Sequence, residues 1–311
     1  MAHPHHPPPL PQFTNSHQEL SLYAYIPAAR QPQLLKILAG IAGMAPEHYT
    51  QHHLIYRPAR PKPSPSAADP FYIQLVSRVD LPKDLGKEEK EERGGGKAIV
   101  YEPRKQQWSM RLEDLPEVTR KPFITRSIYS ATSHSGDLLQ FMRCLGYTYA
   151  LLTGFQEGGC EGGEAVVGRG RERGRDGGRQ RERERGRLIV ISLQAPYFTN
   201  NYRFIHNNVI ITVWQTLIPP RTDSAAAGAA ADAALLGSPF PPEALTKVDP
   251  AEGWTMHAAV RLMLTSAAEV ETTNLATGEL RTLKDALKGI CELDVIERLA
   301  LDTRVKTVGA V

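Results

Sequence analysis

Apolar and polar residues alternate along much of this 311-residue chain, the pattern typical of β-strands with one buried face. The longest alternating run begins at Trp254 and continues with Met256, Ala258, Val260, Leu262 and Leu264 on one face. We expect strands at about residues 19–26, 52–57, 71–79, 98–101, 108–112, 123–130, 147–155, 188–193, 208–217 and 254–264.

Three segments follow the spacing of amphipathic helices instead. The first begins at Pro32, a residue favoured at the first helical position, and should end at Gly43. The second has Asp137 as its N-cap and should close at Gly146. The last covers about residues 279–288, with Leu280, Leu283, Leu287 and Ile290 in register; all three are expected to be short.

Strands that follow strands directly exclude the alternation of a parallel α/β sheet. The pattern predicts an α+β, mostly β fold: an antiparallel, multi-stranded β-barrel with a few short flanking helices. One face of each strand should then fill the interior with apolar side chains. No run of eighteen apolar residues occurs, so we expect no membrane span.

Composition divides the chain into one domain with several inserts. Residues 1–16 are rich in Pro and His, and we expect a disordered tail there. The barrel domain should cover residues 17–306, followed by a tail at 307–311. The expected disordered inserts are at about 58–70, 82–96, 158–187 and 219–250.

The positive charge of the chain comes from one of these inserts. Residues 168–187 hold nine arginines and four acidic residues, a net charge of +5, while the whole chain carries +3. The rest is therefore close to neutral at −2. The Gly, Arg and Glu mixture has no apolar face, so we interpret it as a solvated loop. RNA binding through this loop is the alternative interpretation.

Few residues form a pattern that indicates chemistry. The chain has no phosphate-binding glycine loop, no serine nucleophile elbow and no zinc-protease motif. The Cys144, Cys160 and Cys291 thiols are far apart, which argues against a disulfide framework and a cysteine zinc site. The His3, His5 and His6 side chains lie in the Pro-rich tail, and we treat them as incidental.

Two further groups of side chains are candidate metal ligands. His48 and the adjacent pair His52 and His53 could bind a metal, but neighbours on a strand face opposite sides, so we expect one exposed and one buried histidine. Glu269 and Glu271 have strand spacing, but they follow the last alternating run and are interpreted as a solvated strand end. Glu19 has no glutamate two residues on. We therefore expect no catalytic, cofactor-binding or metal-binding residues, and no enzyme.

Several segments together resemble the Mediator subunit 18 family, in a fungal-type form with insertions. Near the N-terminus they are Gln18 to Tyr23, Ile26 to Ala28, and Leu34 to Met44; in the middle, Gly136 to Tyr147. The most specific segments lie near the C-terminus, Leu287 to Gly289 and Leu293 to Val305. The resemblance spans roughly residues 18–306 and rests on the order and spacing of these segments.

The resemblance implies a non-enzymatic β-barrel, similar to the tunnel triphosphatase fold but without its glutamate-lined centre. It implies a nuclear, structural subunit of the Mediator head module that acts as a coactivator of RNA polymerase II transcription. The implied partners are Mediator subunit 20, in a heterodimer, and the C-terminal helix of Mediator subunit 8. From the sequence itself we expect neither direct nucleic-acid binding nor membrane association.

One alternative comes from a different class of protein. A metal-dependent tunnel-type triphosphatase would need acidic and basic residues that converge on the barrel interior from different strands. The scaffold hypothesis predicts an apolar interior without convergent carboxylates. Trp108, Tyr197, Phe198 and Trp254 are expected to be core residues or interface anchors.

Overall fold

The computed structural model describes residues 15–58, 71–79, 103–118, 122–133, 136–149, 197–218, 245–263 and 269–304. Its strands are β1 (Asn15–Ile26), β2 (Glu47–Pro58), β3 (Ile73–Val79), β4 (Ser109–Glu113), β5 (Ile124–Thr132), β6 (Tyr147–Tyr149), β7 (Tyr197–His206), β8 (Val209–Ile218), β9 (Thr246–Lys247) and β10 (Trp254–Leu262). Its α-helices are α1 (Gln31–Ala42), α2 (Leu138–Cys144) and α4 (Glu269–Ala286). Short 3-10 turns are η1 (Ala28–Arg30), η2 (Pro103–Lys105) and η4 (Arg298–Leu301).

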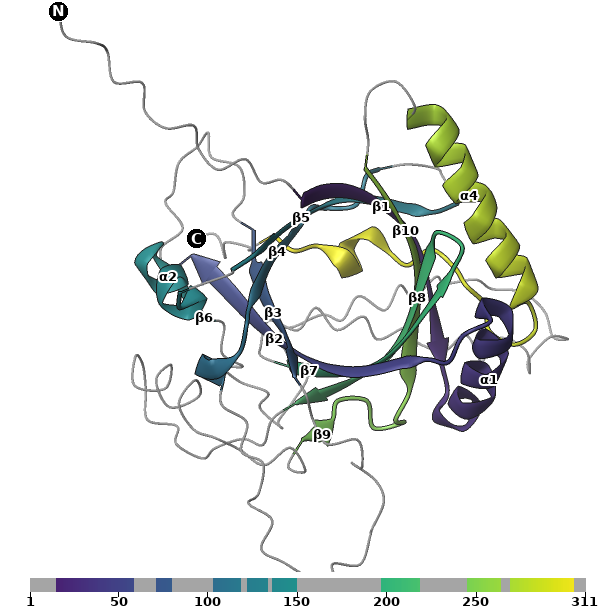
Figure 1. Ribbon diagram of the computed structural model, residues 1–311, viewed down its shortest axis with the longest axis horizontal. Coiled ribbons are helices and arrows are strands. Elements are labelled where there is room, and N and C mark those ends of the chain that lie inside the picture. Colours follow the sequence, from purple (N-terminus) through teal and green to yellow (C-terminus); the bar gives the residue numbers. More distant parts are fainter. Residues whose placement is uncertain are drawn as a thin grey trace, which may run out of the picture.

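Eight antiparallel strands close into a barrel, which Figure 1 shows end-on. The order around the ring is β10, β1, β5, β4, β3, β2, β7 and β8, and pairing of β8 with β10 completes it. The short strands β6 and β9 extend the sheet beside β2 and β8. The predicted antiparallel, mostly β barrel is therefore confirmed.

The main hydrophobic core lies outside the barrel, between its wall and two helices. Helices α1 and α4 cover the same side of the ring (Figure 1). The even-numbered residues of β1 and β10 that alternate in the sequence pack against both helices. This cluster includes Leu20, Leu22, Ala24, Ile26, Leu34, Leu38, Phe204, Ile211, Val213, Met256, Ala258, Val260, Leu262, Leu280, Leu283 and Leu287. The shared face predicted for the strand at 254–264 is thus confirmed as far as the described residues reach.

A second cluster fixes α2 against the other side of the barrel. Leu139 and Met142 of α2 pack on Leu54 and Leu75 of the wall, together with the buried Trp108. The helix begins as predicted, because the Asp137 carboxylate accepts hydrogen bonds from the main-chain N–H groups of residues 139 and 140.

The first helix also matches its prediction. It ends at Gly43, whose φ of 64° is the left-handed conformation that glycine adopts without strain. The predicted helix at 279–288 is ten residues longer at its start, since α4 covers 18 residues from Glu269. It is therefore not short. None of the described helices is both long and apolar enough to cross a membrane.

Other predicted elements differ or lie elsewhere. Strand β7 was not predicted, although it is ten residues long and pairs with both β2 and β8. Strand β9 lies within the range predicted as the insert 219–250. The predicted strands at 98–101 and 188–193 lie outside the described residues, as do residues 1–14, most of the inserts at 58–70, 82–96 and 158–187, and the tail at 307–311.

Candidate functional site

The interior of the barrel is polar, and the expectation of an apolar interior without convergent carboxylates is wrong, because Glu19 of β1 and Glu113 of β4 both line it. The odd-numbered residues of β1, β7 and β10 and the even-numbered residues of β8 face the lumen, while their neighbours form the outer core. The lumen contains a cavity of about 370 Å³. Its lining includes Glu19, Gln51, His53, Gln74, Arg111, Glu113, Arg126, Thr199, Asn201, Arg203, Thr212, Trp214, Thr255, His257 and Arg261.

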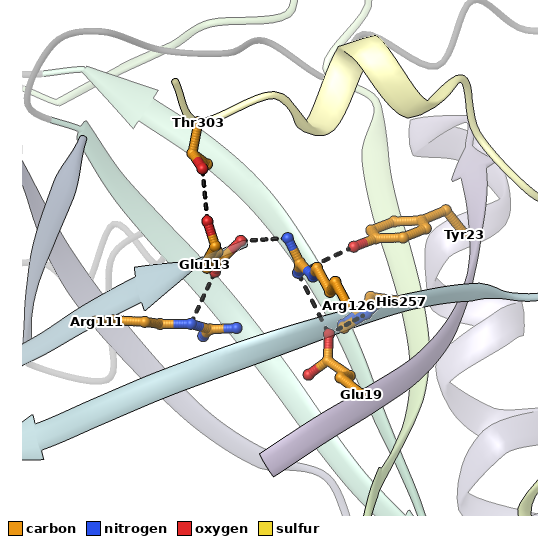
Figure 2. Close-up of polar contacts among 7 residues, drawn as sticks. All are labelled: Glu19, Tyr23, Arg111, Glu113, Arg126, His257 and Thr303. Atoms are coloured by element: carbon orange, nitrogen blue, oxygen red, sulfur yellow. Dashed lines mark hydrogen bonds and ion pairs between the residues drawn. The ribbon is translucent and has the colours of Figure 1, made fainter. Parts of the chain in front are cut away.

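The centre of the lumen is a network of ion pairs between four strands (Figure 2). Arg126 of β5 lies between Glu19 of β1, at 3.3 Å from Nη2 to Oε1, and Glu113 of β4, which its Nη1 contacts. Arg111 Nε lies 2.7 Å from Glu113 Oε1. The side chains of Arg126 and Glu19 are only 5% and 1% exposed, so these charges are almost completely removed from solvent.

Two further side chains complete the network. His257 Nε2 of β10 lies 3.4 Å from Glu19 Oε1, and the imidazole stacks on the Tyr23 ring with 4.5 Å between centroids. The Tyr23 hydroxyl accepts a hydrogen bond of 3.4 Å from Arg126 Nη2. Glu19 therefore faces cationic or proton-donating groups from two neighbouring strands.

The charges of this network stabilise one another. Burial alone would raise the pKa of the Glu19 and Glu113 carboxyl groups. However, His257 and Arg126 hold the pKa of Glu19 well below its ordinary value. Arg111 and Arg126 likewise lower the pKa of Glu113. Burial opposes the charge of Arg126, but Glu113, Tyr23 and Glu19 together raise its pKa. Burial raises the pKa of the Tyr23 hydroxyl to about 12.

One end of the lumen is crossed by residues 293–304, which we call the C-terminal segment (Figure 1). It first pairs with β1, where main-chain hydrogen bonds of 2.9 and 2.8 Å join Tyr23 and Asp294. It then reaches the opposite wall, where the N–H of Tyr72 donates to the carbonyl of Thr303 at 2.8 Å. The Thr303 hydroxyl donates to the main-chain carbonyl of Glu113 at 2.6 Å (Figure 2).

The arrangement connects strands of the barrel through ion pairs. Both buried carboxylates are engaged by arginines. Among the residues that the structure describes, no group of three or more His, Cys, Asp or Glu side chains could hold a metal ion together. The network instead joins β1, β4, β5 and β10 through the inside of the barrel.

The acidic pair named from the sequence lies elsewhere. Glu269 and Glu271 belong to the first turn of α4, so the interpretation as a strand end is wrong. The main chain continues there as a helix because Ala276, Leu280, Leu283 and Leu287 recur at helical spacing and pack on the barrel wall. Glu271 is exposed on the outer side of the molecule and takes no part in the lumen.

The predicted opposite orientation of His52 and His53 is confirmed, but neither faces bulk solvent on the outside. His52 is buried and stacks on Phe198, with 4.1 Å between centroids, and its ring is tilted against that of Trp108 at 5.3 Å. His53 faces the lumen, where it stacks on Tyr197 at 4.5 Å and contacts the Thr199 hydroxyl at 3.0 Å. The sequence pattern predicts one exposed histidine on the polar face of the strand. In a barrel that polar face can line the lumen instead of the outer surface, and this is where His53 lies.

The remaining candidates are dispersed. Cys144 is exposed and Cys291 is buried, whereas Cys160, His3, His5, His6 and the Arg/Gly insert at 168–187 lie outside the described residues. Trp108 and Phe198 are buried core residues, Trp254 is partly buried against the outer core, and Tyr197 lines the lumen.

Sequence reasoning missed the partners of Glu19. Arg126 is 107 residues away in the chain and His257 lies on β10, and only the strand register brings them beside Glu19. A usable signal was present, because charged residues occupy the polar positions of several alternating strands. A chain that keeps charges on the inner face of many strands encloses a polar lumen.

The buried His52 and the partly buried His53 predict loss of stability in mild acid. Burial lowers the pKa of His52 and lowers that of His53 to about 3, far below the 6.5 expected in the unfolded chain. Between those values the unfolded state binds more protons, so stability falls as the pH falls, by up to about 1.4 kcal/mol per pH unit for each histidine. Glu19 and Glu113, whose pKa values are lowered, add a further loss below about pH 4.5.

Urea denaturation at several pH values between about 7.5 and 5 measures this loss. The variant His53→Gln should have a flatter stability profile than the unmodified chain. The control is His48→Gln, because His48 lies on the same strand but is exposed and bonded to Asn200. If the free energy of unfolding of His53→Gln fell with pH as steeply as that of the unmodified chain, His53 would not contribute to the acid sensitivity.

Comparison with known proteins reveals extensive similarity. A sequence profile of the family described as Med18 protein matches residues 18–151 and 192–304. The subunit 18 of Mediator of RNA polymerase II transcription from Yarrowia lipolytica is 22% identical over 296 residues, covering 93% of this chain and 100% of that protein. Its counterpart from Aspergillus fumigatus is 23% identical over 322 residues, covering 93% and 99%.

A solved structure has the same fold. A chain in the structure of the Schizosaccharomyces pombe Mediator head module superposes with a TM-score of 0.55 at 17% sequence identity. The match covers 90% of this chain and 98% of that chain. The similarity therefore extends over the barrel and its helices as a whole.

Proposed function

The chain belongs to the Med18 protein family, and on that premise we propose that it is a structural subunit of the Mediator head module, supporting RNA polymerase II transcription. The observation that carries this function is the family match, which covers both halves of the barrel on either side of residues 152–191. We also propose a nuclear location, which the similarity to subunits of a transcription complex supports.

We further propose that the subunit acts without catalysis. The ion pairs of the lumen support this role, because Glu19 and Glu113 are held by Arg126 and Arg111 rather than left free for a metal or substrate. A network that neutralises its own charges fixes the relative position of strands, which is what a rigid scaffold requires. The function then depends on the outer surface of the barrel.

The proposed partners are Mediator subunit 20, in a heterodimer, and the C-terminal helix of Mediator subunit 8. The family resemblance supports both, and the outer surface offers apolar side chains that a partner could cover. On α2 and its C-cap these are Phe141 and Leu145, 49% and 51% exposed; on α4 they are Val270 and Leu275, 76% and 60% exposed. Assembled Mediator would connect the subunit to RNA polymerase II.

Co-expression with the two partners from the same organism tests this proposal. The bait is the full chain, beside a variant lacking residues 168–187. We expect a stoichiometric complex with both baits. The Arg/Gly insert lies in the gap between the two segments that match the family, residues 18–151 and 192–304, so its deletion leaves both matched segments intact. Folded, soluble bait that captures neither partner would contradict the proposed partners. Loss of capture only in the shortened bait would assign a role in assembly to the insert.

A phosphate-release assay tests the absence of catalysis. Tripolyphosphate is supplied with Mg²⁺ or Mn²⁺, the reactants of a tunnel-type triphosphatase. We expect no release above that of the variant Glu19→Gln. Turnover by the full chain that Glu19→Gln abolishes would overturn the non-enzymatic role and leave the family membership intact.

A further inference from the structure

Both ends of the C-terminal segment are bonded to residues whose side chains belong to the ion-pair network. At its start, Asp294 exchanges main-chain hydrogen bonds with Tyr23, whose hydroxyl accepts from Arg126. At its end, the Thr303 hydroxyl donates to the main-chain carbonyl of Glu113, whose carboxylate is paired with Arg126 (Figure 2). The two attachments therefore converge on one buried guanidinium group.

The connection between β4 and β5 links Arg126 to the segment a second time. Main-chain hydrogen bonds of 2.9 and 2.8 Å tie this connection to the carbonyls of Ser127 and Thr125, on either side of Arg126 in β5. Within the same connection, the carbonyl of Pro116 accepts a hydrogen bond of 2.6 Å from Arg298 Nε of the C-terminal segment. A shift of Arg126 would therefore displace the acceptors that hold the segment.

The segment itself has few buried anchors. Among its residues whose side chains the structure describes, only Leu293 is buried, and Asp294, Val295 and Glu297 are exposed. Its main chain bonds to β1 beyond the point where β5 stops pairing, since β5 reaches only as far as Ser21. A stretch with exposed side chains that is held by hydrogen bonds at a few places opens at a lower free energy than strands paired on both sides.

We propose that the C-terminal segment is a strap whose attachment depends on the ion-pair network, so that the two form one cooperative unit. Breaking the network removes support at both ends of the segment, which then detaches before the rest of the barrel unfolds. Detachment frees the edge of β1 beside Tyr23 and uncovers the end of the lumen that residues 300–303 line. The coupling is reciprocal, because a bond that favours the attached segment favours the intact network by the same free energy.

Amide hydrogen exchange of the full chain, followed by mass spectrometry, tests this coupling. The variant Glu113→Gln removes the negative charge that Arg111 and Arg126 share. We expect exchange in peptides covering residues 293–304 to accelerate by at least roughly tenfold, the effect of weakening a charge-assisted hydrogen bond. Exchange in α2 is the internal reference and should accelerate much less, because this helix packs on a different cluster.

Two further variants accompany Glu113→Gln. The control is Glu47→Gln, which also removes a carboxylate paired with two arginines, but these are Arg78 and Arg203 rather than members of the network. It should leave exchange of the C-terminal segment within about twofold of the unmodified chain. Tyr23→Phe keeps every charge and removes only the hydroxyl that accepts from Arg126. It should accelerate exchange of the segment several-fold, and it replaces Glu113→Gln if that variant does not fold.

The reverse direction of the coupling has its own variant. Thr303→Val keeps the shape of the side chain and removes the donor to the Glu113 carbonyl. We expect faster exchange of the main-chain amides in the connection between β4 and β5, several-fold above the unmodified chain. The control Thr282→Val removes a hydroxyl that also donates to a main-chain carbonyl, that of Gly278 at 3.0 Å on α4, and should leave this connection unchanged.

Three results would overturn the proposal. The first is equal exchange of the C-terminal segment in Glu113→Gln and Glu47→Gln, or in Tyr23→Phe and the unmodified chain. The second is acceleration of the segment and of α2 by the same factor, which would indicate global unfolding in place of local detachment. The third is unchanged exchange between β4 and β5 in Thr303→Val. The partner-capture experiment described above tests a separate property and is unaffected by these results.

Discussion

Replacement of Arg126 by methionine is expected to lower the free energy of unfolding by about 3–5 kcal/mol. The substitution leaves Glu19 and Glu113 as negative charges inside the barrel without their shared partner. Both would then have to be protonated, or draw water into the lumen, for the barrel to stay closed. Urea denaturation of the full chain measures the loss.

A second variant separates lost charge compensation from lost packing. The triple variant Glu19→Gln, Glu113→Gln and Arg126→Met removes these three charges, leaves Arg111, whose side chain is 30% exposed, and keeps similar side-chain volumes. It should recover much of the stability that Arg126→Met loses. The control Arg143→Met removes an exposed arginine and should stay within about 0.5 kcal/mol of the unmodified chain. If Arg126→Met were equally mild, the network would not stabilise the fold.

Replacement of Leu280 by alanine on α4 is expected to cost about 2–5 kcal/mol. Leu280 is 0% exposed and belongs to the cluster that joins α4 and α1 to the barrel wall. Truncation leaves a cavity in the outer core, because strands on one side and a helix on the other restrict its collapse. A loss of this size in the free energy of unfolding would support a hydrophobic core that lies between the barrel wall and the helices.

The same helix supplies the matched control. Leu275 lies five residues earlier and is 60% exposed, so Leu275→Ala should change stability by less than about 0.5 kcal/mol. Both substitutions alter helix propensity equally, so the difference between them measures burial. Similar losses in both variants would contradict the described packing of α4. A partner-capture assay with Leu275→Ala shows separately whether this exposed face takes part in assembly.

Much of the architecture could be predicted from local pattern. The helix that ends at Gly43 and the cap at Asp137 depend on short-range rules, and both are found where expected. The apolar face of β10 was visible as strict alternation. Strand β7 was missed because its middle reads Thr199, Asn200 and Asn201, which are typical of turns. Its pairing on both sides outweighs that local preference.

The site was harder to predict than the fold for a physical reason. Alternation identifies two faces of a strand but does not say which of them is inside. In this barrel the apolar face is covered by helices and the polar face is enclosed, the reverse of the sequence expectation. Glu19 was noticed, but its partners Arg126 and His257 become neighbours only through the register of β1, β5 and β10.

The pairing of β1 with β10 has a consequence for synthesis of the protein on the ribosome. Strand β1 is among the first parts of the barrel to be made, but its partner on one side begins only at Trp254. At ordinary translation rates the intervening chain takes roughly ten to fifty seconds to emerge. During that time Leu20, Leu22 and Ile26 have neither β10 nor α4 to cover them. Closure of the ring is therefore among the last steps of folding, and the nascent chain must be protected from aggregation until then.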